Sequence, residues 1–137
     1  MNECVFCKIG NKEVSAHIVY EDERVVAFLD KHPINMGHVL VVPKKHEPDF
    51  YELDNDTYNH LMSVVKKLSP GIARVTNPKK MGMVIAGFDV PHTHVHLIPM
   101  HAYHDITSKS LLEGNRANPS DEDLGNVAAE LRGFLHG

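Results

Sequence analysis

Three histidines alternate with other residues between positions 92 and 96, and this alternation constrains the fold more than any other feature of the chain. Successive side chains of a β-strand point to opposite faces of its sheet. The pattern therefore predicts a strand with the three imidazoles on one face, while Val95 and Leu97 face the core. A slip of one residue would bury the histidines, so the phase of the predicted strand is unambiguous.

The rest of the sequence contains β-branched or aromatic runs and amphipathic helical segments. A polar turn at 21–23 joins two strands as a hairpin. Asp54 or Asn55 can cap a long helix. Pro70 and the glycine after it are expected to kink or divide that helix. Strands are predicted at 17–20, 24–29, 38–42, 81–88 and 94–100, a short helical turn at 4–9, and a final amphipathic helix from residue 120.

Both longer helices carry one apolar face, and the connections between the later strands are short enough to favour antiparallel pairing. We therefore predict an α+β fold, with an antiparallel five-stranded sheet packed against one long helix and a C-terminal helix. The 137 residues fit a single domain spanning 1–137. The apolar face of the long helix consists of Leu61, Val64, Val65 and Leu68.

Charge and composition exclude several classes of protein. The formal net charge of −4 argues against a general affinity for nucleic acid or for an anionic membrane. No apolar stretch approaches the length of a membrane span, and the first residues lack the features of a secretory signal, so we expect a cytoplasmic protein. Because that compartment is reducing, the pair Cys4 and Cys7 indicates a metal or redox site rather than a structural disulfide.

The residues alone leave three interpretations of the alternating histidines open. They can form a polar face exposed to solvent. They can converge on one transition-metal ion, for which Asp89 would supply a carboxylate ligand. One imidazole can instead act as a nucleophile toward an acyl or phosphoryl group, while its neighbours stabilise charge on the phosphate oxygens.

Three motifs, taken in their order along the chain, resemble the histidine-triad (HIT) family. The sequence HTHVHLI at 92–98 resembles its signature, with Thr93 at a spacer that is more often aliphatic. The sequences FLD at 28–30 and GHVLVVPKKH at 37–46 resemble its upstream segment, and CVFCKI at 4–9 resembles its N-terminal segment. Together these motifs cover residues 4–100 and imply a HIT-like fold.

The resemblance implies covalent catalysis on a nucleotide. His94 would attack the α-phosphorus of a nucleoside phosphoramidate, phosphoester or dinucleoside polyphosphate. The resulting nucleotidyl-histidine would then be resolved by water or by a second acceptor. A backbone carbonyl would hold the other ring nitrogen of His94, and His96 and His38 would lie on the phosphate side. No catalytic metal is required in this scheme.

The resemblance also implies a pocket for an adenosine or other purine nucleotide, and a homodimer. Asp30 would accept hydrogen bonds from the ribose hydroxyls. Asp89 falls near a position that is commonly Ser or Gln, where an ionised carboxylate would repel phosphate. Lys31 stands where the base pocket is usually apolar. The nucleotide-binding set implied by the family comprises Val5, Phe6, Ile9, Phe28, Asp30 and Asp89.

Some bacterial members, and the related uridylyltransferases, complete a cysteine pair like this one with two histidines. The corresponding set here is Cys4, Cys7, His46 and His92. Four protein ligands close the coordination of a zinc ion, so this zinc would be structural, at one per chain. Two rival functions remain at this point: a non-catalytic module that binds zinc and nucleotide, and a metal-dependent hydrolase that uses the triad as ligands.

Overall fold

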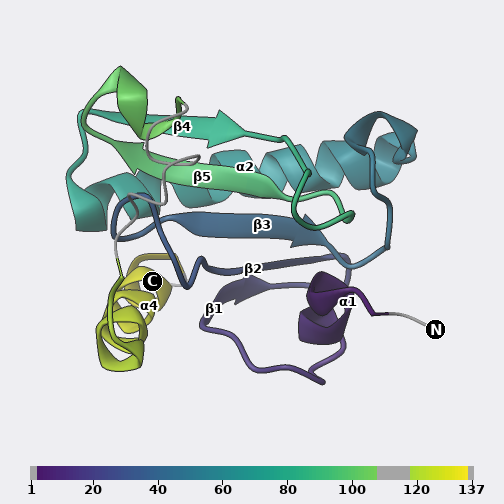
Figure 1. The fold of residues 1–137 in the computed structure, drawn as a ribbon, viewed down its shortest axis with the longest axis horizontal. Coiled ribbons are helices and arrows are strands. Elements are labelled where there is room, and N and C mark those ends of the chain that lie inside the picture. Colours follow the sequence, from purple (N-terminus) through teal and green to yellow (C-terminus); the bar gives the residue numbers. More distant parts are fainter. Residues whose placement is uncertain (1–2, 108–117, 136–137) are drawn as a thin grey trace.

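The computed structural model describes residues 3–107 and 118–135, so part of the polar stretch at 101–119 lies outside the described residues. Figure 1 shows a single sheet with the long helix α2 behind it and the short helix α1 near the N-terminus. The strands are β1 Ile18–Glu21, β2 Val25–Leu29, β3 Val39–Pro43, β4 Lys80–Val84 and β5 Val95–Met100. The helices are α1 Val5–Gly10, α2 Asn55–Thr76 and α4 Asp121–Leu135, with 3-10 turns at Phe50–Glu52 and Tyr103–Asp105.

The five strands are antiparallel and lie in the order β1-β2-β3-β5-β4. This arrangement confirms the predicted α+β class, the five-stranded sheet and both of the longer helices. Leu40 of β3 lies opposite His96 of β5, and Val41 lies opposite Val95. The sheet therefore places the two central strands, β3 and β5, beside each other although more than fifty residues separate them in the sequence.

The sheet is covered on both faces, which explains why every residue of β2 and of β3 is buried. One face packs against α2 and α4 and includes Val41, Val95 and Leu97, as the alternation predicted. The other face packs against α1, where Phe6 and Phe28 belong to the same apolar cluster. The imidazoles lie on this second face, under α1, and not on an open solvent face.

Helix α2 begins at one of the two predicted caps, because the Asp54 carboxylate accepts a hydrogen bond of 3.0 Å from the backbone amide of Thr57. The helix is not divided at Pro70, contrary to one of the two expected outcomes. Leu68 and Ile72, on either side of the proline, are fully buried. Their packing against the sheet outweighs the backbone hydrogen bond that proline removes.

Every predicted strand boundary lies within one residue of the observed one, except the end of the strand at 81–88. The expected strand at 81–88 ends at Val84, which lies opposite His96, because β5 begins at Val95 and has no further residues to pair with 86–88. Strand β5 begins at Val95, so His92 and His94 precede the strand. Among the described residues, no helix combines the length and the apolar character needed to cross a bilayer.

The β1–β2 turn is tied to α2 by a polar cluster centred on Asp22. Its carboxylate accepts hydrogen bonds from the backbone amides of Arg24 and Val25, the hydroxyl of Tyr20 and Nε2 of His60, at 2.7–2.8 Å. Burial raises the pKa of Asp22, but these hydrogen bonds outweigh it and hold the pKa at about 2. The charged carboxylate therefore stabilises the folded chain.

Candidate active site

A cavity of about 270 Å³ lies between α1 and the sheet. Its walls come from α1, the segment 14–17, the end of β2 and the residues around the start of β5. Phe6 and Phe28 form an edge-to-face aromatic pair there, with ring centroids 5.5 Å apart. The lining contains all six residues of the expected nucleotide-binding set: Val5, Phe6, Ile9, Phe28, Asp30 and Asp89, together with His94 and His96.

His94 is held by its own backbone. Its Nδ1–H donates a hydrogen bond of 2.7 Å to the carbonyl oxygen of His92, two residues earlier. The ring is only 5% exposed and lies 4.9 Å from the ring of Phe6. In a neutral imidazole only one nitrogen carries a proton, so this contact leaves Nε2 of His94 with an available electron pair.

His38 and His96 form a second, directional pair. The backbone amide of Ile34 donates to Nδ1 of His38 at 3.1 Å, which assigns the proton of a neutral His38 to Nε2. That Nε2–H donates to Nδ1 of His96 at 2.9 Å. A neutral His96 then carries its own proton on Nε2, so a ring that lines the cavity is a hydrogen-bond donor.

His38 itself is fully buried behind His96 and reaches the cavity through that contact. Asp30 follows β2 directly. Its Oδ1 accepts a hydrogen bond of 2.9 Å from the backbone amide of His32, and its Oδ2 lies 3.7 Å from Nε2 of His38. Because Asp30 also lines the cavity, an acceptor carboxylate and the donor His96 face one ligand space.

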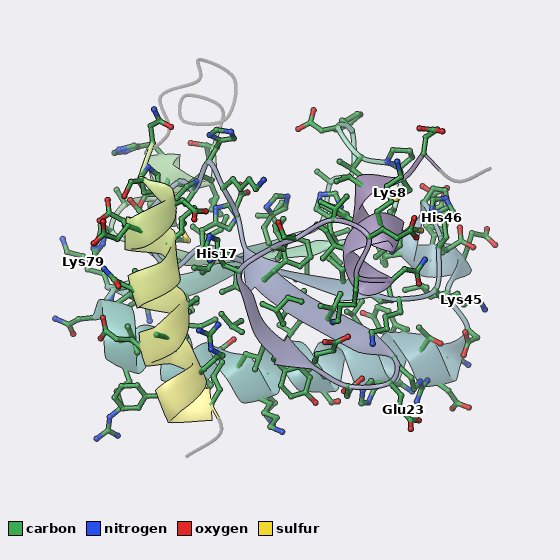
Figure 2. The ribbon with its side chains drawn as sticks, turned by 90° about the horizontal axis from the view of Figure 1, so that it is seen from below. Lys8, His17, Glu23, Lys45, His46 and Lys79 are labelled. Atoms are coloured by element: carbon green, nitrogen blue, oxygen red, sulfur yellow. The ribbon has the colours of Figure 1, made fainter. Side chains whose placement is uncertain are left out.

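Four potential metal ligands come together beside α1: Cys4 precedes the helix, Cys7 lies on it, His46 follows β3 and His92 precedes β5 (Figure 2 shows His46 close to α1). The two His Nδ1 atoms are 3.2 Å apart, and the distances from sulfur to Nδ1 are 3.2–3.4 Å. On a tetrahedral zinc with ordinary bond lengths, two nitrogens are about 3.3 Å apart and nitrogen and sulfur about 3.6 Å. The geometry of the cluster therefore fits one such ion.

The protonation state of His92 also suits a metal ligand. Its Nε2–H donates to the carbonyl oxygen of Pro43 at 2.7 Å, which leaves the electron pair on Nδ1, the atom that faces the sulfurs. Burial lowers the pKa of His92, so the ring stays neutral. The carbonyl of Pro43 also orients the ring, a role that second-sphere groups commonly play for metal-binding histidines.

The three triad imidazoles do not converge on one ion. His92 faces the cysteines, His94 its own backbone, and His96 the buried His38. Asp30, His38 and His96 do place three ligand atoms within 4.8 Å of one another. A metal there would need the Nε2 electron pair of His38, whose Nδ1 already accepts from Ile34, and a neutral imidazole offers only one such pair. The hydrogen bonds thus disfavour a triad-bound metal.

Two contacts around the cavity are not among the predictions from the sequence. The hydroxyl of the buried Thr93 donates a hydrogen bond of 2.7 Å to the carbonyl of Glu47 and so anchors the residue after His46. An aliphatic residue at position 93 could not make this bond. His17, labelled in Figure 2, lines the cavity. Its Nε2 lies 2.8 Å from Oδ1 of Asp121 at the start of α4. Neither contact has a local signal, because each joins segments far apart in the sequence.

A five-stranded antiparallel sheet that carries a histidine triad beside a ligand-sized cavity defines the class of histidine-triad proteins. The model of the HIT domain matches residues 11–103, and the chain belongs to the HIT family. It is 41% identical over 138 residues to an uncharacterized HIT-like protein of Borreliella burgdorferi, covering 96% of this chain and 97% of that protein. It is 32% identical over 136 residues to adenosine 5′-monophosphoramidase HNT1 of Saccharomyces cerevisiae, covering 98% and 84%.

Solved structures agree with this assignment. A hypothetical histidine triad nucleotide-binding protein from Sulfolobus tokodaii has a TM-score of 0.82 and 35% identity, covering 97% of this chain and 92% of that one. A Zn-bound histidine triad family protein from Mycobacterium smegmatis has a TM-score of 0.80 and 26% identity, covering 98% and 94%.

Proposed function

We propose that this protein cleaves the bond between the α-phosphorus of a nucleoside 5′-phosphate derivative and its leaving group, through a nucleotide covalently attached to His94. The observation that carries the proposal is the 2.7 Å hydrogen bond from Nδ1 of His94 to the carbonyl of His92. It keeps the electron pair of the neutral ring on Nε2, in a residue that lines the cavity. An imidazole held in this way is an effective nucleophile.

The substrate would lie with its base between α1 and β2 and its ribose on Asp30. Phe6, Ile9 and Phe28 supply an apolar slot for the base, and the Asp30 carboxylate accepts from the ribose hydroxyls. This placement brings the α-phosphate against the imidazoles of His94 and His96. Holding the phosphorus next to the nucleophile lowers the barrier by proximity alone.

In the first step Nε2 of His94 forms a bond to phosphorus while the bond from phosphorus to the leaving nitrogen or oxygen breaks. The electron pair of that bond departs with the leaving group, and an amine takes its proton from solvent. Nε2–H of His96 donates a hydrogen bond to the phosphoryl group and stabilises the charge that develops there. The carbonyl of His92 stabilises the phosphorylated, positively charged ring of His94.

In the second step water attacks the phosphorus, the bond from phosphorus to Nε2 of His94 breaks, and a nucleoside monophosphate leaves. The water loses one proton to solvent, and His94 returns to its neutral form with the proton on Nδ1. His38 acts as a positioning residue in both steps, because its Nε2–H sets the orientation and the tautomer of His96.

We further propose that the Cys4, Cys7, His46 and His92 cluster holds one zinc ion through two thiolates and two neutral imidazoles. A closed set of four ligands supplies a structural cross-link and leaves no open position for substrate. The cluster joins α1 to the segments around both histidine-bearing strands. The zinc-bound relative from Mycobacterium smegmatis supports this choice of metal.

The test of the function is a comparison of the wild-type chain with His94→Ala on adenosine 5′-phosphoramidate and on diadenosine tetraphosphate. We expect kcat/KM to fall about 10³-fold or more, the scale seen when a nucleophile is removed. A rapid quench into alkaline denaturant, followed by mass spectrometry, should find AMP on His94. His104→Ala, which removes an exposed imidazole outside the cavity, is the matched control.

Two results would count against covalent catalysis. Undiminished turnover by His94→Ala would exclude His94 as the nucleophile. AMP binding without turnover or labelling would favour the rival function, a non-catalytic module for zinc and nucleotide. The yeast relative named as an adenosine 5′-monophosphoramidase supports the catalytic alternative and an adenosine substrate.

We also propose a homodimer formed through α2 and the edge strand β4. An apolar hollow of about 540 Å³ lies between them, and Met83 on the strand is 54% exposed. The apolar face predicted on α2 consists of Leu61, Val64, Val65 and Leu68. These residues pack in the core against the chain's own sheet, so this face alone does not explain a dimer. Light scattering on Met83→Lys should show a shift from dimer to monomer, and an unchanged mass would contradict this interface.

A further inference from the structure

The charged residues that line the cavity are unevenly distributed. They are Asp30, Lys31 and Asp89, so the lining carries two carboxylates and one ammonium group. Both Asp30 and Lys31 follow β2, at the end of the sheet where that strand finishes. Asp89 belongs to the segment that leads into β5. Strands β2 and β5 run in the same direction, and His92, just before β5, donates to the carbonyl of Pro43, which lies opposite Val25 at the start of β2. The segment that carries Asp89 therefore leads in from the start of β2, whereas Asp30 lies beyond its end.

The two carboxylates also differ in their surroundings. Asp30 is tied to the amide of His32 and lies 3.7 Å from His38, which suits a fixed acceptor. Asp89 is exposed and makes no hydrogen bond or ion pair with any other described residue. It precedes His92 by three residues, and no lysine or arginine of the described cavity lining comes from this segment. A phosphate beside His94 and His96 therefore has a carboxylate, and no cation, on the Asp89 side.

We propose that Asp89 makes the protein selective for substrates whose leaving group carries a positive charge, namely amides of a nucleoside monophosphate with a diamine or a similar cationic amine. This inference rests on the proposed function. With the ribose on Asp30 and the phosphorus at His94, the leaving group would extend toward Asp89, which lines the same cavity. An ammonium group there pairs with the carboxylate, whereas the phosphates of a dinucleoside polyphosphate are repelled by it.

The size of the effect follows from the exposure of Asp89. A solvent-exposed charge pair changes an equilibrium by about threefold. A cationic leaving group gains this factor and an anionic one loses it, so the two differ by about tenfold. Salt screens such exposed pairs, so the difference should shrink as ionic strength rises.

The experiment uses three adenosine 5′-phosphoramidates of nearly equal size, whose amines are 1,2-diaminoethane, ethanolamine and glycine. Their leaving groups carry a positive, a neutral and a negative charge beyond the reacting nitrogen. We expect wild-type kcat/KM to favour the diaminoethane amide over the glycine amide by about tenfold. Asp89→Asn should remove this preference and Asp89→Lys should reverse it.

The matched control is Glu23→Gln, which removes one exposed carboxylate in the β1–β2 turn, outside the cavity (Figure 2), and should keep the preference. Dissociation constants of the same amides on the His94→Ala chain measure the charge preference without turnover. If only the proposed function is wrong, the wild-type chain will show no turnover and no labelling of His94, while the charge preference in binding remains. A wild-type chain without charge preference, or a preference that survives Asp89→Asn, overturns the assignment to Asp89.

Discussion

Removing the proposed zinc ion should unfold helix α1, which forms one wall of the proposed nucleotide cavity. Helix α1 has six residues, fewer than a helix needs to be stable on its own. Burial of Phe6 and Ile9 contributes about 3–6 kcal/mol, while ordering the six residues costs about 6–12 kcal/mol. The deficit of a few kcal/mol falls within the contribution of a structural zinc, about 10 kcal/mol or more.

We therefore expect α1 to unfold locally in the metal-free chain while the sheet and α2 stay folded. The base would then lose its contacts with Val5, Phe6 and Ile9. Losing one apolar and aromatic wall costs about 1.5–3 kcal/mol, which corresponds to an AMP dissociation constant about 10- to 100-fold higher. Calorimetric titration with AMP measures the affinity, and amide hydrogen exchange across residues 4–10 measures the order of α1.

The design compares three samples: the zinc-loaded chain, the same chain after chelation, and the double variant Cys4→Ser/Cys7→Ser. Added zinc should restore affinity to the chelated chain but not to the variant. His94→Ala is the control for zinc content, because it replaces a histidine outside the cluster and should keep one zinc per chain. If metal-free protein bound AMP within about twofold of the loaded protein and kept slow exchange in α1, the estimate from burial and chain entropy would be refuted.

Three further predictions follow from single contacts. Asp22→Asn should cost about 2 kcal/mol of unfolding free energy at pH 7, because the pKa of Asp22 is about 2 in the folded chain against 3.8 for an ordinary aspartate. This contribution is complete above the unfolded-state pKa and is lost as pH falls from about 4 toward 2. Urea unfolding should therefore show the unfolding free energies of the wild type and the variant converging in acid. A difference that stays constant with pH would contradict this role of Asp22. His38→Phe should lower kcat about 10²-fold by removing the donor to His96, and His38→Gln should restore part of it; equal activity of the two variants would exclude the positioning role. Thr93→Val should cost about 1 kcal/mol and weaken zinc retention, since the hydroxyl anchors Glu47 beside His46; competition with a chelator measures this, and unchanged retention would argue against the coupling.

Local patterns in the sequence were sufficient for the elements of the fold. The alternation at 92–97 placed Val95 and Leu97 in the core, and the spacing of apolar residues in α2 placed its buried face against the sheet. These predictions depend only on the periodicity of strands and helices, which each segment carries by itself. The prediction of a strand reaching residue 88 was wrong beyond Val84, because an apolar composition does not reveal that the partner strand β5 begins only at Val95.

The candidate site depended on the sequence in a different way. Composition and spacing singled out the cysteine pair and the histidines, and the family resemblance supplied their partners. No local signal in the sequence predicted that His38 would be fully buried behind His96. Nor did any local signal predict that the amide of Ile34 would set the tautomer of His38. The same holds for the contact of Thr93 with Glu47.

The sequence by itself thus determined which residues share a face and which segments form strands and helices. Only the tertiary structure decided the direction of each hydrogen bond, and with it which ring nitrogen of His92, His94 and His96 holds a proton. The physical reason is that side-chain alternation is a property of one strand, whereas the tautomer of an imidazole is chosen by the groups around it. For His92 and His96 those groups lie 46–88 residues away in the sequence, and only the folded chain, through its sheet and the packing of α1, brings them within hydrogen-bond distance.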